Sequence, residues 1–257
     1  MDDAVDRAAI TTALALAGCV AAEEEADELL AAAGDARDLR SMVTRRLTGE
    51  PLAWITGRTV FCDLEVTVDP GVYVPRWQSE PLARLAAHLL PPTGVGVDLA
   101  TGSGAIAMVM QAARPGARVV ATEIDPVAVR CARRNGVVVH PGHLDRPLPA
   151  VLASEVDVLC GVLPYVPSDA LRLLPRDVLA FEPRAALDGG DGGLDAVAAV
   201  VRGSRRWVRS GGWLALEVGG DQVPVVNTLF EAAGYGAVDV LEDGDGDPRA
   251  IVGQRVG

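Results

Sequence analysis

The feature that most constrains this fold is a series of short apolar runs, separated by helical stretches, that follows Pro92. The runs are Val95 to Leu99, Arg118 to Glu123, Val137 to His140, Val156 to Gly161 and Trp213 to Val218. Strands that alternate with helices of ten or more residues are typical of a parallel sheet with helices on both faces. The pattern therefore predicts an α/β fold.

The end of the chain follows a different pattern. Gly236 to Leu241 and Arg249 to Gln254 are joined by the acidic, turn-rich segment 242–248. A turn-rich segment between two strand-like runs favours an antiparallel hairpin. We therefore expect the last two strands to pair at an edge of the sheet.

The N-terminal part carries helical signals only. A break at Gly34 precedes an amphipathic stretch from Asp35 to Leu47, in which apolar residues recur at helical spacing. From Pro51 to Pro75 the pattern changes to alternation, which predicts a hairpin with its turn at Pro70 and Gly71. We expect a helical domain over residues 1–50, a β-hairpin linker over 51–75 and a ligand-binding domain over 76–257.

Charge and composition exclude several functional classes. The net charge of −12 disfavours a nucleic-acid substrate, because such binding depends on Lys and Arg. The four cysteines have no CxxC spacing and the chain has three histidines, so we expect reduced cysteines and no metal site. The uncharged stretch Ala8 to Ala22 is too short to span a bilayer, and no basic segment precedes it. We expect a soluble, cytoplasmic protein without membrane partners.

A glycine-containing loop follows the first predicted strand. It runs from Asp98 to Gly104, and a helix begins directly afterwards. Glycines at such a position let backbone amides approach a ligand, although a plain tight turn has the same composition. The next strand ends at Glu123, where a carboxylate can accept both hydroxyls of a ribose. Together these features favour a nucleoside-binding site.

Two cofactor classes use this arrangement. A nicotinamide dehydrogenase also combines glycines with a later acid, but its loop normally has the form G-x-G-x-x-G. Here Asp98 ends the strand, where its charge suits the ammonium or sulfonium group of a zwitterionic cofactor. The terminal hairpin also suits a seven-stranded methyltransferase sheet of order 3-2-1-4-5-7-6. S-adenosylmethionine is therefore the preferred ligand.

The fourth predicted strand leads into Val162-Leu163-Pro164-Tyr165. A Pro-Tyr pair there stiffens the loop over the carboxyl edge of the sheet and offers an aromatic face to an acceptor. From Pro51 to the C-terminus the sequence resembles the HemK/PrmC family of class I methyltransferases. The segments that carry the resemblance are PLAWITGR, VPRWQSE, DLATGSGAIA, EIDPVAVRCARRN, LPYVP, FEPRAALDGGDGGLDAV, SGGWLALEVGGDQ and DGDGDPRAIVGQR.

The resemblance implies methylation of a glutamine side-chain amide in peptide chain release factors. It implies these cofactor-binding residues: Arg76, Asp98, Ala100, Thr101, Gly102, Gly104, Ile106, Glu123, Ile124, His143 and Leu144. It implies that Val162, Leu163, Pro164 and Tyr165 position the acceptor. It also suggests that Trp77 could line the acceptor pocket and that the segment from Glu182 to Gly190 flanks the substrate channel.

The chain departs from the family pattern at several positions. The family motif is N-P-P-Y, so Val162 replaces the Asn that orients the amide and Leu163 replaces the first Pro. Ala100 stands at the first loop glycine, and His143 stands where an acid is often found. A small-molecule acceptor with an N or O nucleophile, a DNA adenine methyltransferase and a non-catalytic binding module therefore remain alternatives to a protein acceptor. An ordinary ion pair between Arg76 and Glu80 is the alternative to a cofactor role for Arg76.

Overall fold

The computed structural model describes residues 6–174, 176–243 and 245–257. Its main element is a seven-stranded sheet. The strands are β3 (Val95–Leu99), β4 (Arg118–Glu123), β5 (Val139–Pro141), β6 (Val156–Gly161), β7 (Val208–Glu217), β8 (Tyr235–Glu242) and β9 (Pro248–Arg255). Their order is β5-β4-β3-β6-β7-β9-β8; the first five are parallel, and β9 is antiparallel to both neighbours. Counted within the sheet this is 3-2-1-4-5-7-6, so the predicted fold and order are confirmed.

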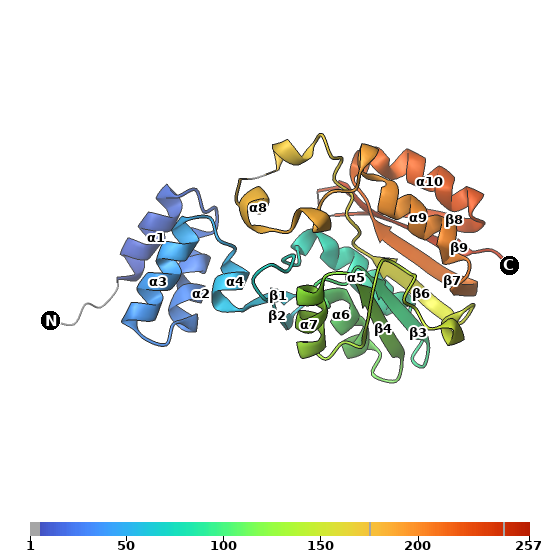
Figure 1. Cartoon of the computed structure of the whole chain (residues 1–257), viewed down its shortest axis with the longest axis horizontal. Helices are drawn as coiled ribbons and strands as arrows, with labels where there is room; N and C mark the ends of the chain where they lie inside the picture. Colours follow the sequence, from blue (N-terminus) through green and yellow to red (C-terminus); the bar gives the residue numbers. More distant parts are fainter. Residues whose placement is uncertain (1–5, 175, 244) are drawn as a thin grey trace.

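Helices cover both faces of this sheet (Figure 1). One face packs against α5 (Glu80–Leu89), α6 (Ala105–Ala113) and α7 (Pro126–Arg134), and the other against α9 (Asp195–Ser204) and α10 (Val223–Ala232). Successive strand residues point to opposite faces, so Val158 packs on the first face and Leu159 on the second. Burial on both faces explains why these strands are continuous apolar runs.

Two strands begin two or more residues away from their predicted starts, and the other strand ends differ by at most one residue. β5 begins at Val139 rather than Val137, because the N–H of Val137 donates back to Ala132 and closes α7. β7 begins at Val208, five residues before the predicted start at Trp213, and its pairing with β6 is irregular near Val156. In both cases a neighbouring element, and not the local sequence pattern, determines where the strand begins.

Three helices form a separate N-terminal group at one end of the molecule (Figure 1): α1 (Arg7–Leu16), α2 (Ala22–Ala32) and α3 (Ala36–Leu47). Leu14, Leu29 and Leu39 form the centre of their shared core. The carboxylate of Asp35 caps α3 by accepting two backbone N–H groups at 2.8 Å, as expected at a helix start. Within the described ranges, no helix combines the length and apolar character needed to cross a membrane.

The segment that links the two parts differs from the predicted hairpin. It begins with a short helix, α4 (Leu52–Thr56), and the hairpin covers only β1 (Arg58–Phe61) and β2 (Leu64–Thr67). The turn is Cys62-Asp63, both at positive φ, so its placement at Pro70 and Gly71 was wrong. A two-residue turn shifts the phase of the alternation, which leaves Val60 71% exposed opposite Glu65.

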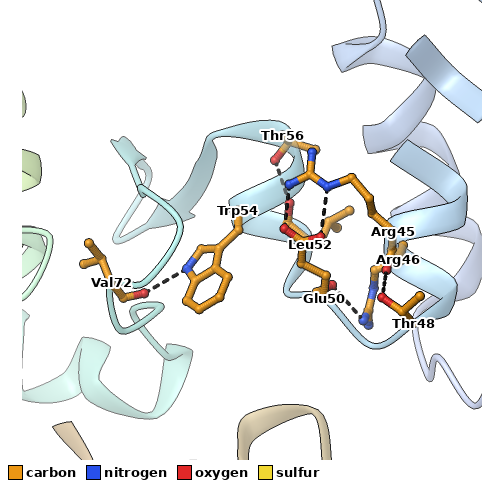
Figure 2. Close-up of polar contacts among 8 residues, drawn as sticks. All are labelled: Arg45, Arg46, Thr48, Glu50, Leu52, Trp54, Thr56 and Val72. Atoms are coloured by element: carbon orange, nitrogen blue, oxygen red, sulfur yellow. Dashed lines mark hydrogen bonds and ion pairs between the residues drawn. The ribbon is translucent and has the colours of Figure 1, made fainter. Parts of the chain in front are cut away.

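Helix α4 belongs to both hydrophobic cores. Trp54 packs into the core of the sheet, whereas Ile55 packs into the core of the N-terminal helices. The indole Nε1 of Trp54 donates to the carbonyl of Val72 at 2.9 Å (Figure 2). On the other side, Arg46 pairs with Glu25 at 2.6 Å in a mostly buried position. The packing of α4 and the Trp54 hydrogen bond attach the N-terminal helices to the rest of the fold, whereas the Arg46–Glu25 pair joins α2 to α3.

Cys62, Cys131 and Cys160 carry free thiols, as predicted. Cys62, Cys131 and Cys160 are buried, and Cys19 is half-buried. Burial raises the pKa of Cys62 to about 11, so this thiol is protonated at neutral pH.

Candidate active site

A cavity of about 910 Å³ lies at the carboxyl ends of β3, β4 and β6. In parallel α/β sheets this edge is where ligands bind. The predicted site residues on its wall are Asp98, Ala100, Thr101, Gly102, Ile106, Glu123, Ile124, His143, Leu144, Val162 and Pro164. Arg76, Gly104, Leu163 and Tyr165 lie outside this wall. The fold thus brings most of the predicted cofactor residues to one cavity.

The loop after β3 has a backbone that favours glycine. Ala100, Gly102 and Gly104 all have positive φ, at 51°, 58° and 90°. A Cβ at Gly104 would lie 2.8 Å from a methyl carbon of Val137, so this glycine lets α6 pack closely. Ala100 adopts a left-handed backbone conformation, which costs an alanine roughly 1 kcal/mol relative to the right-handed one.

Asp98 is the most deeply buried acid of the cavity wall, with 1% of its surface exposed. One carboxylate oxygen accepts the hydroxyl proton of Thr101 and, at 3.2 Å, the N–H of Ala107. Burial raises the pKa of Asp98 to about 7, although these hydrogen bonds act in the opposite direction. A cation placed beside Asp98 would therefore favour its ionised form.

Glu123 ends β4 and connects it to the glycine loop. One oxygen accepts the N–H of Gly102 at 2.9 Å, and the other accepts the N–H groups of Ile124 and Asp125 at 2.7 and 2.9 Å. A carboxylate has about four lone-pair sites and three are used here, so the oxygen that accepts the Gly102 N–H can still accept one ribose hydroxyl. The same side chain fixes the loop and faces the cavity.

The cavity wall is strongly acidic. Its carboxylates are Asp98, Glu123, Asp125, Asp188 and Asp195. Among the residues that the structure describes, the arginine on this wall is Arg184, which pairs with Asp188 at 2.9 Å. Such a wall attracts a cationic group and disfavours the pyrophosphate of a dinucleotide. The residues therefore fit S-adenosylmethionine, which carries a sulfonium and an ammonium group.

The segment after β6 is tightly held. The amide of Gln222 donates to the carbonyls of Tyr165 and Gly192 at 2.8 and 2.9 Å. A Cβ on Gly193 would collide with the Tyr165 carbonyl, so the two loops fit only without a side chain there. Val162 and Pro164 line the cavity, whereas Leu163 is buried in the core. This arrangement fixes the loop beside the cavity.

Arg76 neither pairs with Glu80 nor lies on the cavity wall, which were the two possibilities considered from the sequence. It forms an ion pair with the buried carboxylate of Glu182 and stacks over the ring of Tyr73 at 5.4 Å. Glu80 instead pairs with Arg84 at 3.2 Å and accepts the N–H of Cys62. Arg76 thus ties the segment before α5 to the segment after α8 (Arg176–Phe181).

Some of the remaining sequence predictions for the cavity are confirmed and others are wrong. Trp77 is 60% exposed and lies outside the wall, so it does not line the pocket. The segment from Glu182 to Gly190 does flank the cavity, through Pro183, Arg184, Asp188 and both glycines. Asp145, two residues after His143, accepts the indole N–H of Trp207 at 2.7 Å and supports the fold.

Sequence reasoning missed three polar residues near the cavity. Tyr73 and Ser79 line it, and Glu217 lies behind them at the end of β7. Ser79 and Glu217 lay within quoted motifs, but no local pattern marks them as neighbours. Their proximity depends on how the segment before α5 crosses the sheet edge.

Comparisons with known proteins agree with this geometry. Residues 63–140 match the family model of the methyltransferase small domain. The release factor glutamine methyltransferase of Geobacter sulfurreducens is 35% identical over 224 residues, which cover 85% of this chain and 78% of that protein. The release factor glutamine methyltransferase of Burkholderia pseudomallei is 37% identical over 247 residues, or 90% of this chain and 85% of that protein.

A solved structure supports the fold independently. The ribosomal protein L11 methylase of Lactobacillus delbrueckii subsp. bulgaricus has a TM-score of 0.52 and 16% identity, covering 77% of this chain and 90% of that one. The sheet order, the acidic cavity and the relatives lead to one assignment. The chain belongs to the release factor glutamine methyltransferase (HemK/PrmC) family of S-adenosylmethionine-dependent methyltransferases.

Proposed function

We propose that this protein transfers a methyl group from S-adenosylmethionine to the side-chain amide nitrogen of a glutamine in a release factor. The observation that carries the proposal is the single acidic cavity, which joins the glycine loop, Glu123 and the Val162–Tyr165 loop. When bound, the cofactor supplies an electrophilic methyl group on a positively charged sulfur. Transfer from such a group depends mainly on alignment of the nucleophile.

We assign the cofactor to the part of the cavity formed by the loops after β3, β4 and β5. Glu123 would accept a ribose hydroxyl, and the carboxylate of Asp98 would lie beside a cationic group. Ile124 and Leu144 offer apolar surface for the adenine, with His143 next to them. Ala100, Thr101, Gly102 and Ile106 complete this part of the wall.

We assign the acceptor to the part of the cavity beside Val162 and Pro164. The backbone carbonyl of Leu163 would accept a hydrogen bond from the amide nitrogen, while the fixed loop holds that carbonyl in place. Because Val162 offers no hydrogen-bond acceptor, a small molecule with an N or O nucleophile is the second candidate. A glutamine amide remains the first, because both relatives described above are named for it.

We also propose that three parts of the chain have different functions. Residues 1–50 would form an acceptor-recognition domain, residues 51–75 a linker, and residues 76–257 the cofactor-binding domain. The core that α1 to α3 form, which Ile55 of α4 joins, supports this division. A chain that begins at Gly49 should then retain cofactor affinity and lose methylation of an intact release factor.

We place the protein in the cytoplasm. The buried, unpaired thiols of Cys62, Cys131 and Cys160 suit a reducing compartment, where thiols persist. A release factor as acceptor is consistent with the same location.

The test is incubation of the protein with methyl-labelled cofactor and either purified release factor or cell extract. Label in the release factor, lost when its acceptor glutamine is replaced by alanine, supports the proposal. Label that enters only small molecules from the extract would favour the second candidate.

A further inference from the structure

We infer that the hydroxyl of Ser79, supported by Glu217, forms a hydrogen-bond acceptor that selects a neutral, N–H-bearing amide over a carboxylate at the acceptor part of the cavity. The inference rests on the proposed function, since it assumes that the acceptor is a protein side chain. It explains how a site with Val162 can still orient an amide.

The hydroxyl of Ser79 does not cap the helix that follows it. Ser79 is the residue before α5, where a serine usually caps the helix, yet its side chain makes no capping hydrogen bond. The residue is 3% exposed and lines the cavity, and its Oγ has no hydrogen-bond partner among the residues that the structure describes. The lone pairs of a buried hydroxyl need a donor, so a bound N–H group is the expected partner of Ser79.

Glu217 lies directly behind this hydroxyl. It ends β7, next to β6, and is 3% exposed. Its Oε2 also lacks a hydrogen-bond partner in the described part of the chain. The hydroxyls of Ser79 and Tyr165 are close enough to lower the pKa of Glu217, although burial raises that pKa by more. Glu217 therefore connects Ser79 to the loop that carries Pro164.

The direction of the hydrogen bonds follows from these neighbours. When Glu217 is ionised, its carboxylate only accepts hydrogen bonds, so the Ser79 hydroxyl would turn its proton toward Glu217. The lone pairs of Ser79 would then face the cavity as acceptors. Val162, on the same wall, adds neither a donor nor an acceptor.

This polarity distinguishes two similar side chains. The amide of glutamine carries two N–H donors, one of which can bind Ser79 and so fix the plane of the nitrogen. The carboxylate of glutamate has no such donor and would meet the negative charge of Glu217. A site of this kind can reject an isosteric side chain strongly, because the mismatch leaves buried polar groups unpaired.

The experiment measures kcat and KM of the full chain for a release factor, together with its cofactor affinity by calorimetry. Ser79→Ala should lower kcat/KM for the acceptor about tenfold and leave cofactor affinity unchanged, whereas Ser79→Thr should retain wild-type activity within about threefold. The matched control is Ser204→Ala, which removes another buried serine hydroxyl, bonded to Tyr235 away from the cavity. The control should leave both kinetic constants unchanged.

Glu217 is a positioning residue, and coupling tests its role. If it acts through Ser79, Glu217→Gln should lower kcat/KM, and Ser79→Ala combined with Glu217→Gln should be no worse than Ser79→Ala alone. Equal activity of Ser79→Ala and the wild type on release factor would overturn the inference and leave the proposed function intact. Fully additive losses would overturn the role of Glu217. No label in release factor with the wild type would instead refute the proposed function itself.

Discussion

Replacement of Glu123 by alanine tests the cofactor assignment most directly, because this side chain has two separable tasks. Its carboxylate accepts three backbone N–H groups, from Gly102, Ile124 and Asp125. Hydrogen bonds to a charged group contribute about 1.5–3 kcal/mol each, and neighbouring bonds are not additive. We expect Glu123→Ala to lower the free energy of unfolding by about 3 kcal/mol.

The effect on cofactor binding can be measured separately from the effect on folding. If Glu123 accepts a ribose hydroxyl, its loss should weaken cofactor binding at least tenfold, or about 1.4 kcal/mol. Urea denaturation measures the first quantity, and calorimetry with S-adenosylmethionine below the unfolding range measures the second. The two numbers together separate folding from binding.

Asp157 supplies a matched control. It is also a buried strand carboxylate, but it lies at the amino end of β6, where it accepts the N–H of Val95 at 2.7 Å and pairs with Arg209. Asp157→Ala should lower stability and leave cofactor affinity within twofold of wild type. If Glu123→Ala also kept its cofactor affinity within twofold, the assignment of the ribose to this carboxylate would be wrong.

Three further predictions concern the loop and the acceptor segment. Burial raises the pKa of Asp98 from 3.8 to about 7, so between these values the folded state keeps a proton that the unfolded chain loses. The free energy of unfolding of the wild type should therefore fall as the pH rises from 5 to 7.5. Measured by urea denaturation, this fall should be roughly 2–4 kcal/mol larger for the wild type than for Asp98→Asn. In the same assay at constant pH, Ala100→Gly should stabilise the fold by about 0.5–1 kcal/mol, because Ala100 has a φ of 51°. Gly104→Ala should destabilise the fold by about 2–4 kcal/mol, because the added Cβ would collide with Val137. Val162→Asn with Leu163→Pro should raise kcat/KM for release factor about tenfold by adding an acceptor for the amide; a decrease would favour a different acceptor.

Local patterns predicted the central strands well. β3, β4 and β6 begin and end at the predicted residues, because strands buried on both faces leave an uninterrupted apolar run. The hairpin turn was misplaced because Val60 and Val66 share a sequence phase but face opposite sides once Cys62 and Asp63 form the turn. Periodicity cannot reveal such a phase shift when neither turn residue is glycine.

The candidate site could be predicted only in part. Residues of the glycine loop and Glu123 follow strands directly, so their place at the carboxyl edge follows from the fold class. Ser79 and Glu217 come together because a segment before the first sheet strand crosses the edge of a strand far along the chain. The partner of Arg76 is likewise distant, since Glu182 follows α8. Contacts of this kind require the tertiary structure.

The short helix α4 also determines how a bound acceptor would be presented. Trp54 and Ile55 are consecutive, so they point about 100° apart around the helix, and each is anchored in a different core. Trp54 further bonds to Val72, a residue of the cavity wall, and contacts the ring of Phe181 in α8 edge-on. A protein docked on α1 to α3 would therefore be held at a set distance and angle from the cavity. Helix α4 would thus fix the distance between the docked protein and the cavity, and this distance would determine which glutamine of the acceptor reaches Pro164.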